Sequence, residues 1–234
     1  MSDYQALVLG ASGAIGNAFL MHFQNDPACT LAVGLSRQSD LHFELEDEDS
    51  MAHCAAALRN SSGRYGACQF KYIIDATGAL TLDGQGPEKR LQALNAKQLL
   101  RQLEVNAVGP ALLIKHFLPL LLTQSAACYA TLSARVGSIE DNHKGGWYGY
   151  RAAKAARNML LQTAAIEAAR QKPLAVFAAL QPGTVQSSLS AQFVASQDAI
   201  TPQDSVAQLM QVLGKLRPTG RAQFVDYAGH EIPW

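Results

Sequence analysis

The chain has 234 residues, of which 48% are hydrophobic, so it is long enough to bury a large core. Its 19 basic residues balance 19 acidic ones, and the formal net charge is zero. This balance excludes the strongly basic surfaces that bind nucleic acid or anionic membranes, and it favours a small-molecule partner. We expect one α/β domain over residues 1–234.

The cysteines are scattered through the chain without a Cys-x-x-Cys pair. This spacing argues against a zinc or other metal site and against a disulfide framework, and it predicts reduced, buried thiols. The first apolar run, residues 6–9, is too short for a signal peptide, and the run over residues 111–122 is interrupted by polar residues and Pro119. We therefore expect a soluble cytoplasmic protein. The four cysteines are Cys29, Cys54, Cys68 and Cys128.

Short apolar segments alternate with segments of helical periodicity along the whole chain. The alternation predicts a doubly wound α/β fold, in which a parallel sheet of about seven strands is covered by helices on both faces. Strands are predicted at residues 4–9, 30–35, 41–45, 71–76, 127–132, 174–180 and 222–227. Helices are predicted at about 14–25, 49–60, 88–101, 103–124, 148–171 and 202–216, with a bend or interruption at Pro119.

In a parallel sheet of this kind, ligands bind outside the carboxyl ends of the strands. Five predicted strand ends are followed there by glycine, proline or a polar residue, namely Gly10, Ser36, Asp75, Ser133 and Pro182. The loops at these positions are expected to converge on one edge of the sheet, where a ligand site would form.

A glycine-rich turn, residues 10–16, joins the first predicted strand to the first predicted helix. Glycine permits a tight turn and lets backbone N–H groups approach a pyrophosphate at the helix N-terminus. An ordinary strand-to-helix turn is the alternative. The dinucleotide contacts expected from this turn are Gly10, Ser12, Gly13, Ala14, Ile15 and Gly16.

Ser36 and Arg37 follow the second predicted strand, where a fold specific for NAD usually places an acidic residue on the ribose hydroxyls. A guanidinium beside a hydroxyl suits a 2′-phosphate, because charge-assisted contacts from arginine are strong and often bidentate. We therefore expect NADP(H) to be preferred over NAD(H), with a solvated Arg37 as the alternative.

Tyr150 and Lys154 stand four residues apart, so on the predicted helix they share one face. A phenol has an unperturbed pKa of about 10, and a nearby ammonium group in a partly closed cleft would lower it toward working pH. Tyr148 competes for this role but lies about 240° around the helix from Lys154. The alternative is an accidental pair on a helix surface.

These motifs occur in an order and spacing that resemble the short-chain dehydrogenase/reductase family over essentially the whole chain, which implies a Rossmann fold. The motifs are the glycine turn 10–16, Asp75-Ala76-Thr77-Gly78, residues 105–110, Ser133, Tyr150-x-x-x-Lys154 and Gln181-Pro182-Gly183. Within the family, residues 133–138, residues 145–151 and the Ile232-Pro233-Trp234 ending resemble the C-factor-like branch of cytoplasmic carbonyl reductases.

The resemblance implies a catalytic tetrad of Asn106, Ser133, Tyr150 and Lys154. Tyr150 would donate a proton to a carbonyl, Ser133 would hold the carbonyl oxygen, and Lys154 would lower the pKa of Tyr150 and bind the nicotinamide ribose. Asn106 would position a water for proton relay, or alternatively hold a helix bend. The further cofactor contacts that the resemblance implies are Ala76, Thr77, Gly78, Pro182, Gly183, Val185 and Ser187.

Three positions depart from the family pattern. The glycines of the turn stand at its first, fourth and seventh positions, where the classical branch has them at the first, fifth and seventh. Residues 75–78 replace Asn-Asn-Ala-Gly. Ser133 precedes Tyr150 by more residues than in the classical branch, so Ser138 is the alternative catalytic serine.

The sequence thus predicts an NADP-dependent oxidoreductase that reduces a ketone or aldehyde, or oxidises the alcohol. The alternative is a dinucleotide-sensing protein that uses the same fold without turnover. The loop at about 185–201 is expected to cover the substrate. A homodimer or homotetramer is expected through the helices at 103–124 and 148–171, by which the family usually pairs.

Overall fold

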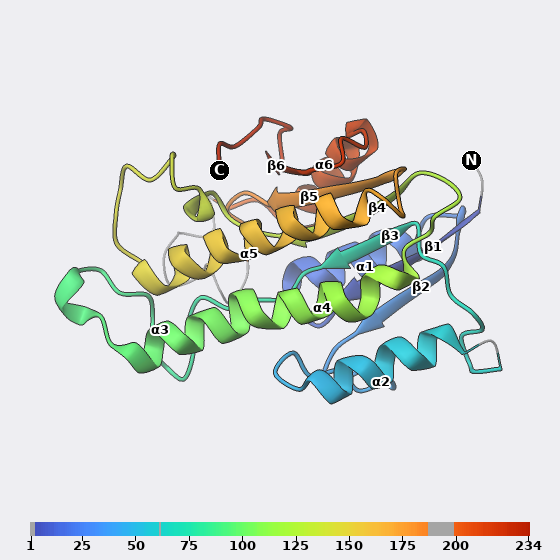
Figure 1. Cartoon of the computed structure of the whole chain (residues 1–234), viewed down its shortest axis with the longest axis horizontal. Helices are drawn as coiled ribbons and strands as arrows, with labels where there is room; N and C mark the ends of the chain where they lie inside the picture. Colours follow the sequence, from blue (N-terminus) through green and yellow to red (C-terminus); the bar gives the residue numbers. More distant parts are fainter. Residues whose placement is uncertain (1–2, 61, 187–198) are drawn as a thin grey trace.

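The computed structural model describes residues 3–60, 62–186 and 199–234, and within them every strand belongs to one parallel sheet (Figure 1). The strand order is β2-β1-β3-β4-β5-β6. From β1 the chain adds β2 on one side, and it then crosses to β3 on the other side of β1. This reversal creates a crevice at the carboxyl ends of β1 and β3. The six strands are β1 Tyr4–Leu9, β2 Cys29–Leu35, β3 Tyr72–Asp75, β4 Ala127–Leu132, β5 Ala175–Gln181 and β6 Ala222–Asp226.

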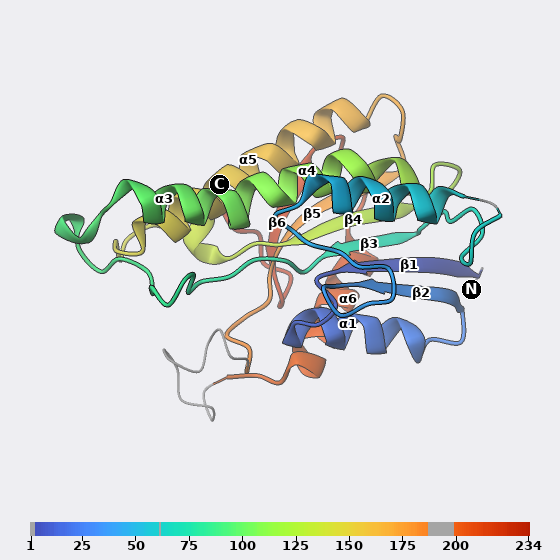
Figure 2. The ribbon, with the colours of Figure 1, turned by 90° about the horizontal axis from the view of Figure 1, so that it is seen from below.

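Helices cover both faces of the sheet. Helices α1 and α6 lie on one face, and α2, α3, α4 and α5 lie on the other (Figure 2). This arrangement confirms the predicted doubly wound fold. The helices are α1 Ala14–Gln24, α2 Glu48–Arg59, α3 Ala96–Leu103, α4 Gly109–Phe117, α5 Tyr148–Ala168 and α6 Pro202–Lys215.

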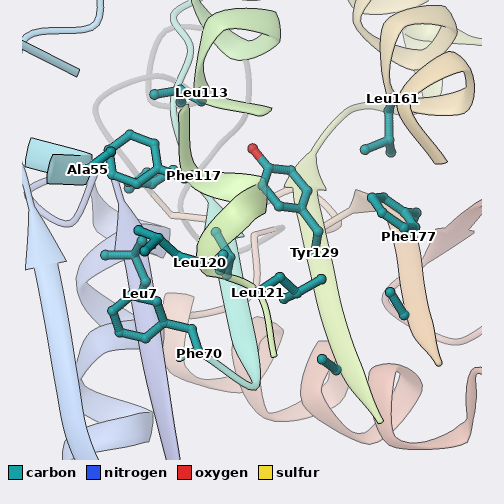
Figure 3. Close-up of a cluster of buried hydrophobic side chains, with 14 of the residues drawn as sticks. Leu7, Ala55, Phe70, Leu113, Phe117, Leu120, Leu121, Tyr129, Leu161 and Phe177 are labelled. Carbon is teal, nitrogen blue, oxygen red and sulfur yellow. The ribbon is translucent and has the colours of Figure 1, made fainter. Parts of the chain in front are cut away.

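The strands read as nearly continuous apolar runs because both of their faces are buried. All six residues of β4 are buried, and two apolar clusters lie above and below the sheet. In the larger cluster, Leu161 of α5 lies beside Phe177 of β5, and Phe117 of α4 lies beside Ala55 of α2 (Figure 3). The rings of Tyr129 and Phe177, which are register partners on β4 and β5, stack with centroids 6.3 Å apart.

The seventh strand, predicted at residues 41–45, does not form. Phe43 is buried and Leu41 and Leu45 are partly buried, so the apolar alternation reflects real burial. The backbone of this segment, however, bonds to local partners: the Phe43 N–H donates to the Ser36 carbonyl, and the N–H of Glu44 donates to a side chain at the start of α2. A loop that folds back in this way cannot join the sheet, and the described sheet has six strands.

The predicted helix at 88–101 is also wrong at its start. A short 3₁₀ turn, Leu91–Ala93, precedes α3, which begins only after Asn95, whose side chain accepts a hydrogen bond from the Gln98 N–H. The predicted helix at 103–124 is divided into a π-helical turn, Glu104–Val108, then α4, then a 3₁₀ turn at Leu118–Leu120 that contains Pro119. The interruption at Pro119 is as predicted, whereas the π-helical turn was not.

Three of the four cysteine thiols are buried, and Cys29 is half-buried. In the part of the chain that the structure describes, no helix is long and apolar enough to cross a membrane. The same residues contain no group of three histidine, cysteine or acidic side chains placed to hold a metal ion.

Candidate active site

A cavity of about 540 Å³ opens at the carboxyl ends of β1, β3, β4 and β5. Its wall comes from the loops that follow these strands and from the first turns of α5. Parallel strands bring their carboxyl ends to one edge, so segments far apart in the sequence meet there, as predicted. The lining residues are 13–16, 76–81, 132–136 and 181–185, together with Trp147, Tyr150 and Lys154.

The glycine turn brings the N-terminus of α1 to this cavity. Gly10 has a positive φ of 83°, and Gly16 packs so closely that a Cβ on it would lie 2.2 Å from the Gly10 carbonyl oxygen. Gly13 is the N-cap of α1, no side chain caps the helix, and its first turn carries no acidic residue. Free N–H groups at a helix N-terminus favour an anion, so this end of the cavity fits a phosphate group.

Tyr150 and Lys154 lie side by side on the buried face of α5 and both line the cavity. The Lys154 Nζ donates to the Leu132 carbonyl oxygen at 3.0 Å and lies 5.5 Å from the centroid of the Tyr150 ring. Tyr148 is 37% exposed and is not part of the cavity wall, whereas Tyr150 is 7% exposed. The geometry therefore favours Tyr150 over Tyr148.

Burial controls the ionisation of both groups. It raises the pKa of Tyr150 to about 12, against an opposing effect of the Arg157 charge. Burial, assisted by Arg157 and opposed by Asp75, holds the pKa of Lys154 well below its usual value. The net shift of the Tyr150 pKa is thus opposite to the lowering expected from Lys154. At neutral pH the phenol keeps its proton and is available as a donor.

Ser133 lines the cavity directly after β4, and its hydroxyl donates to Asn158 Oδ1 at 2.6 Å. Asn158 follows Lys154 by one helical turn, so it holds the serine from the same face of α5. Ser138 is buried outside the cavity wall, and its Oγ accepts a hydrogen bond from the Asp141 N–H at 3.0 Å. Of the two candidate serines, Ser133 is the one that lines the cavity together with Tyr150.

Asn106 projects from the π-helical turn and lies behind the cavity wall rather than in it. Its Oδ1 accepts from the Ala79 N–H at 3.0 Å, and its Nδ2 donates to the Ala79 carbonyl at 2.8 Å and to Gln102 Oε1 at 2.9 Å. A π-helical turn adds one residue to a helix and often marks a functional site. Here it directs the amide onto the loop that follows β3, so Asn106 ties that loop to the π-helical turn.

The predicted cofactor residues fall into three groups. Gly10, Ser12, Ser36 and Arg37 do not line the cavity: Ser36 is buried beside the glycine turn, and Arg37 is exposed. Ser187 lies outside the described residues, as does most of the predicted substrate loop 185–201. The predicted residues that do line the cavity are Gly13, Ala14, Ile15, Gly16, Ala76, Thr77, Gly78, Tyr150, Lys154, Pro182, Gly183 and Val185.

Sequence reasoning missed several polar residues that hold the site from behind. Asn158 and Arg157 are buried on the same face of α5 as Tyr150 and Lys154, and Gln102 is buried one turn before Asn106. A search for polar residues spaced three, four or seven positions from the predicted tetrad would have found all three, because they share its helical faces.

Glu88 was missed for a different reason, since it lies far from the tetrad in the sequence. Its buried carboxylate accepts from the Gly149 N–H at 3.1 Å, and its backbone carbonyl accepts from the Trp147 N–H. These contacts cap the N-terminus of α5 immediately before Tyr150. A Cβ on Gly149 would lie 3.0 Å from Glu88 Oε1, so glycine permits the close approach.

Comparison with known proteins identifies relatives with the same organisation. A model of the family described as short chain dehydrogenase matches residues 5–198. The 1-hydroxy-2-glutathionyl-2-methyl-3-butene dehydrogenase of Rhodococcus sp. (strain AD45) is 26% identical over 237 aligned positions, which cover 97% of this chain and 98% of that protein. The C-signal protein of Myxococcus xanthus is 33% identical over 137 positions, which cover 58% of this chain and 78% of that protein.

Solved structures share the fold at low sequence identity. An NADPH-bound carbonyl reductase from chicken fatty liver aligns with a TM-score of 0.83 and 21% identity over 100% of both chains. A short-chain dehydrogenase/reductase from Burkholderia multivorans with bound NADP aligns with a TM-score of 0.81 and 20% identity, covering 99% of this chain and 100% of that one. The family model matches residues 5–198, which is well over half of this chain, so this chain belongs to the short-chain dehydrogenase/reductase family.

Proposed function

We propose that this protein is an NADP-dependent oxidoreductase that reduces a ketone or aldehyde, or oxidises the corresponding alcohol. The observation that carries the proposal is the pairing of a buried phenol and a buried lysine in one cavity whose wall also includes the N-terminus of α1. The carbonyl reductase with bound NADPH among the structural relatives supports the same reading.

The residues fit a dinucleotide that extends along the cavity. The backbone N–H groups of residues 14–16 would hold the diphosphate, and Lys154 would hold the nicotinamide ribose. The dinucleotide supplies the hydride when bound, and the protein supplies orientation and the proton. Residues 181–185 line the same cavity as Tyr150 and would hold the nicotinamide.

Proton transfer is assigned to Tyr150. Its phenol would donate a proton to the carbonyl oxygen as the alcohol forms, and the same group would accept the proton in the reverse direction. Ser133 would hold the carbonyl oxygen by its hydroxyl, which must turn away from Asn158 to do so. Asn106 would support the proton relay, in which it is expected to position a water, by holding the loop at Ala79 in place.

Turnover separates this proposal from the sensor alternative. Purified protein is expected to consume NADPH when supplied with a panel of ketones and aldehydes, and to form the alcohols. A dinucleotide sensor would bind NADPH without consuming it. Tight NADPH binding together with no consumption across aliphatic, aromatic and cyclic carbonyl compounds would favour the sensor.

Arg37 is proposed to select NADPH over NADH. Arg37→Asp is expected to weaken NADPH binding by roughly 10- to 100-fold more than NADH binding, because it replaces a charge-assisted contact with repulsion of the 2′-phosphate. Titration of both dinucleotides by fluorescence measures this ratio. Arg170→Asp is the control, since it makes the same charge change on an exposed residue beyond the far end of α5. Equal losses for NADPH and NADH in Arg37→Asp would assign the preference to another residue.

Ser133 is expected to matter for turnover and Ser138 is not. Ser133→Ala removes a donor aimed at the developing negative charge on oxygen, a loss that typically costs about 10²- to 10³-fold in turnover. Ser138→Ala is the matched control, because that hydroxyl is equally buried but lies outside the cavity wall. Steady-state rates at saturating NADPH measure both, and a larger loss in Ser138→Ala would reverse the assignment.

A homodimer or homotetramer in the cytoplasm remains our proposal for assembly and location. The segments expected to pair are 103–124 and 148–171, and large apolar side chains are exposed on α5, on the π-helical turn before α4 and on α3 just before that turn. Those that support the proposal are Leu100, Val108, Met159, Leu160 and Ile166.

A further inference from the structure

Arg157 of α5 is the largest fully buried side chain in the described part of the chain, and it carries a charge. Its partner is Asp75 at the end of β3, whose side chain is 0% exposed. Removing two charges from water is costly, and an apolar pair of similar volume is often at least as stable. Because an apolar pair would serve stability as well, this ion pair is expected to have a role in the neighbouring cavity.

The guanidinium binds the turn that follows β3. Its Nη1 donates to the Thr77 carbonyl at 2.9 Å, its Nη2 donates to the Asp75 carboxylate, and its Nε donates to Thr131 Oγ1 at 2.6 Å. Asp75 in turn accepts from the N–H and hydroxyl of Thr77, at 3.0 and 2.6 Å, and from the Thr131 hydroxyl at 2.8 Å. Three elements, α5, β3 and β4, are thus joined by one fully paired network.

This network ends at Gly78, where the proposed catalytic groups meet. A Cβ placed on Gly78 would lie 2.8 Å from Asn106 Oδ1, 3.4 Å from Lys154 Nζ and 3.5 Å from Arg157 Nη1. Gly78 has a φ of 127°, a conformation that other residues rarely adopt. Residues 76–81 form one wall of the cavity, so a shift of this turn would change the wall beside the Lys154 amine.

We propose that Arg157 is a positioning residue of the active site: paired with Asp75, it clamps the Thr77–Gly78 turn against α5 and fixes Lys154 at the cavity wall. This inference rests on the proposed function for its consequence in turnover. The clamp itself is a property of the folded chain without dinucleotide.

The charges around Lys154 make the clamp measurable. The groups that face it are Tyr150 and Arg157 on α5 and Asp75 at the end of β3, and the buried Tyr129 of β4 interacts with the same Asp75 and Arg157. Arg157 lowers the pKa of Lys154, and Asp75 raises it by a smaller effect. Removing both charges is therefore expected to move the Lys154 titration upward.

The test compares the double variant Asp75→Asn/Arg157→Leu with Leu161→Ala. The double variant leaves no unpaired buried charge, so it is expected to fold. Leu161→Ala creates a cavity one helical turn further along α5 without touching the network, so it controls for lost stability (Figure 3). Three quantities are measured: the melting temperature, the NMR titration of the Lys154 side chain without dinucleotide, and the affinity for NADPH with the pH profile of turnover.

The double variant is expected to bind NADPH roughly tenfold more weakly and to turn over up to about 10²-fold more slowly, the loss that a misplacement of about 1 Å can cause. Its Lys154 titration and the pH profile move upward, whereas Leu161→Ala lowers the melting temperature and moves neither. Unchanged NADPH affinity and turnover in the double variant overturn the proposal, whether or not the Lys154 titration moves. So does a Leu161→Ala variant that reproduces both changes.

The test also covers two further cases: a double variant that does not fold, and a wild-type protein that does not bind NADPH. If the double variant fails to fold, Arg157→Lys keeps the charge beside Asp75 but loses the fork that reaches Thr77 and Thr131. It is expected to weaken NADPH binding while the Lys154 titration stays in place, and wild-type affinity would overturn the clamp. If the wild-type protein does not bind NADPH, the proposed function fails, whereas the Lys154 titration of the double variant still tests whether the Arg157 and Asp75 charges act on Lys154 in the folded chain.

Discussion

Replacing Tyr150 by phenylalanine is expected to lower turnover by about 10²- to 10⁴-fold, the range typical of a lost general acid, while NADPH affinity stays nearly unchanged. The ring remains in the cavity wall, so packing is preserved and only the proton donor is removed. Steady-state rates at saturating NADPH and a fluorescence titration of NADPH measure the two quantities on the same preparation.

Tyr148→Phe is the matched control for this variant. It removes the same hydroxyl from the same helical turn, but Tyr148 is 37% exposed and does not line the cavity. Its turnover is expected to equal that of the wild type. Full turnover in Tyr150→Phe, or a loss in Tyr148→Phe instead, would show that the proton donor is misassigned.

Gly16→Ala is expected to be the most destabilising substitution in the glycine turn. The added Cβ would lie 2.2 Å from the Gly10 carbonyl oxygen and 3.2 Å from the Ala11 Cα, and both are backbone atoms that cannot rotate away. Overpacking of this kind costs about 3 kcal/mol or more, which lowers the melting temperature by roughly 6–12 °C in a chain of this size. NADPH binding is expected to be lost with the turn.

Gly13→Ala provides the comparison within the same turn. Its backbone has a φ of −73°, which alanine adopts readily, and the nearest atom to the added Cβ lies 3.5 Å away. The expected loss of stability is less than about 1 kcal/mol. Thermal melts of both variants without dinucleotide test the prediction, and it is contradicted if Gly13→Ala melts as low as Gly16→Ala.

The features that the sequence predicted well are those with a short-range physical signature. The Tyr150–Lys154 pair depends only on helical spacing, and the glycine turn depends only on local backbone freedom between a strand and a helix. The structure places Tyr150, Lys154 and Ser133 in one cavity with residues 13–16, as the carboxyl-edge rule for parallel sheets predicts.

The features that the sequence could not predict depend on long-range pairing. The segment 41–45 alternates like a strand, but its backbone bonds to Ser36 and to the start of α2, and periodicity does not report backbone partners. The contact of Arg157 with Asp75 joins residues 82 positions apart, and no local pattern couples them. The raised pKa of Tyr150 follows from burial, which spacing alone does not reveal.

The most direct test of the proposed function is the stoichiometry of the reaction. The alcohol formed is measured against the NADPH consumed, with the best substrate of the carbonyl panel, for wild-type protein and Tyr150→Phe side by side. We expect equal amounts of alcohol and consumed NADPH in the wild type, and an initial rate reduced by about 10²-fold or more in Tyr150→Phe. NADPH loss without alcohol, or equal rates in the two proteins, would contradict a carbonyl reductase with Tyr150 as its proton donor.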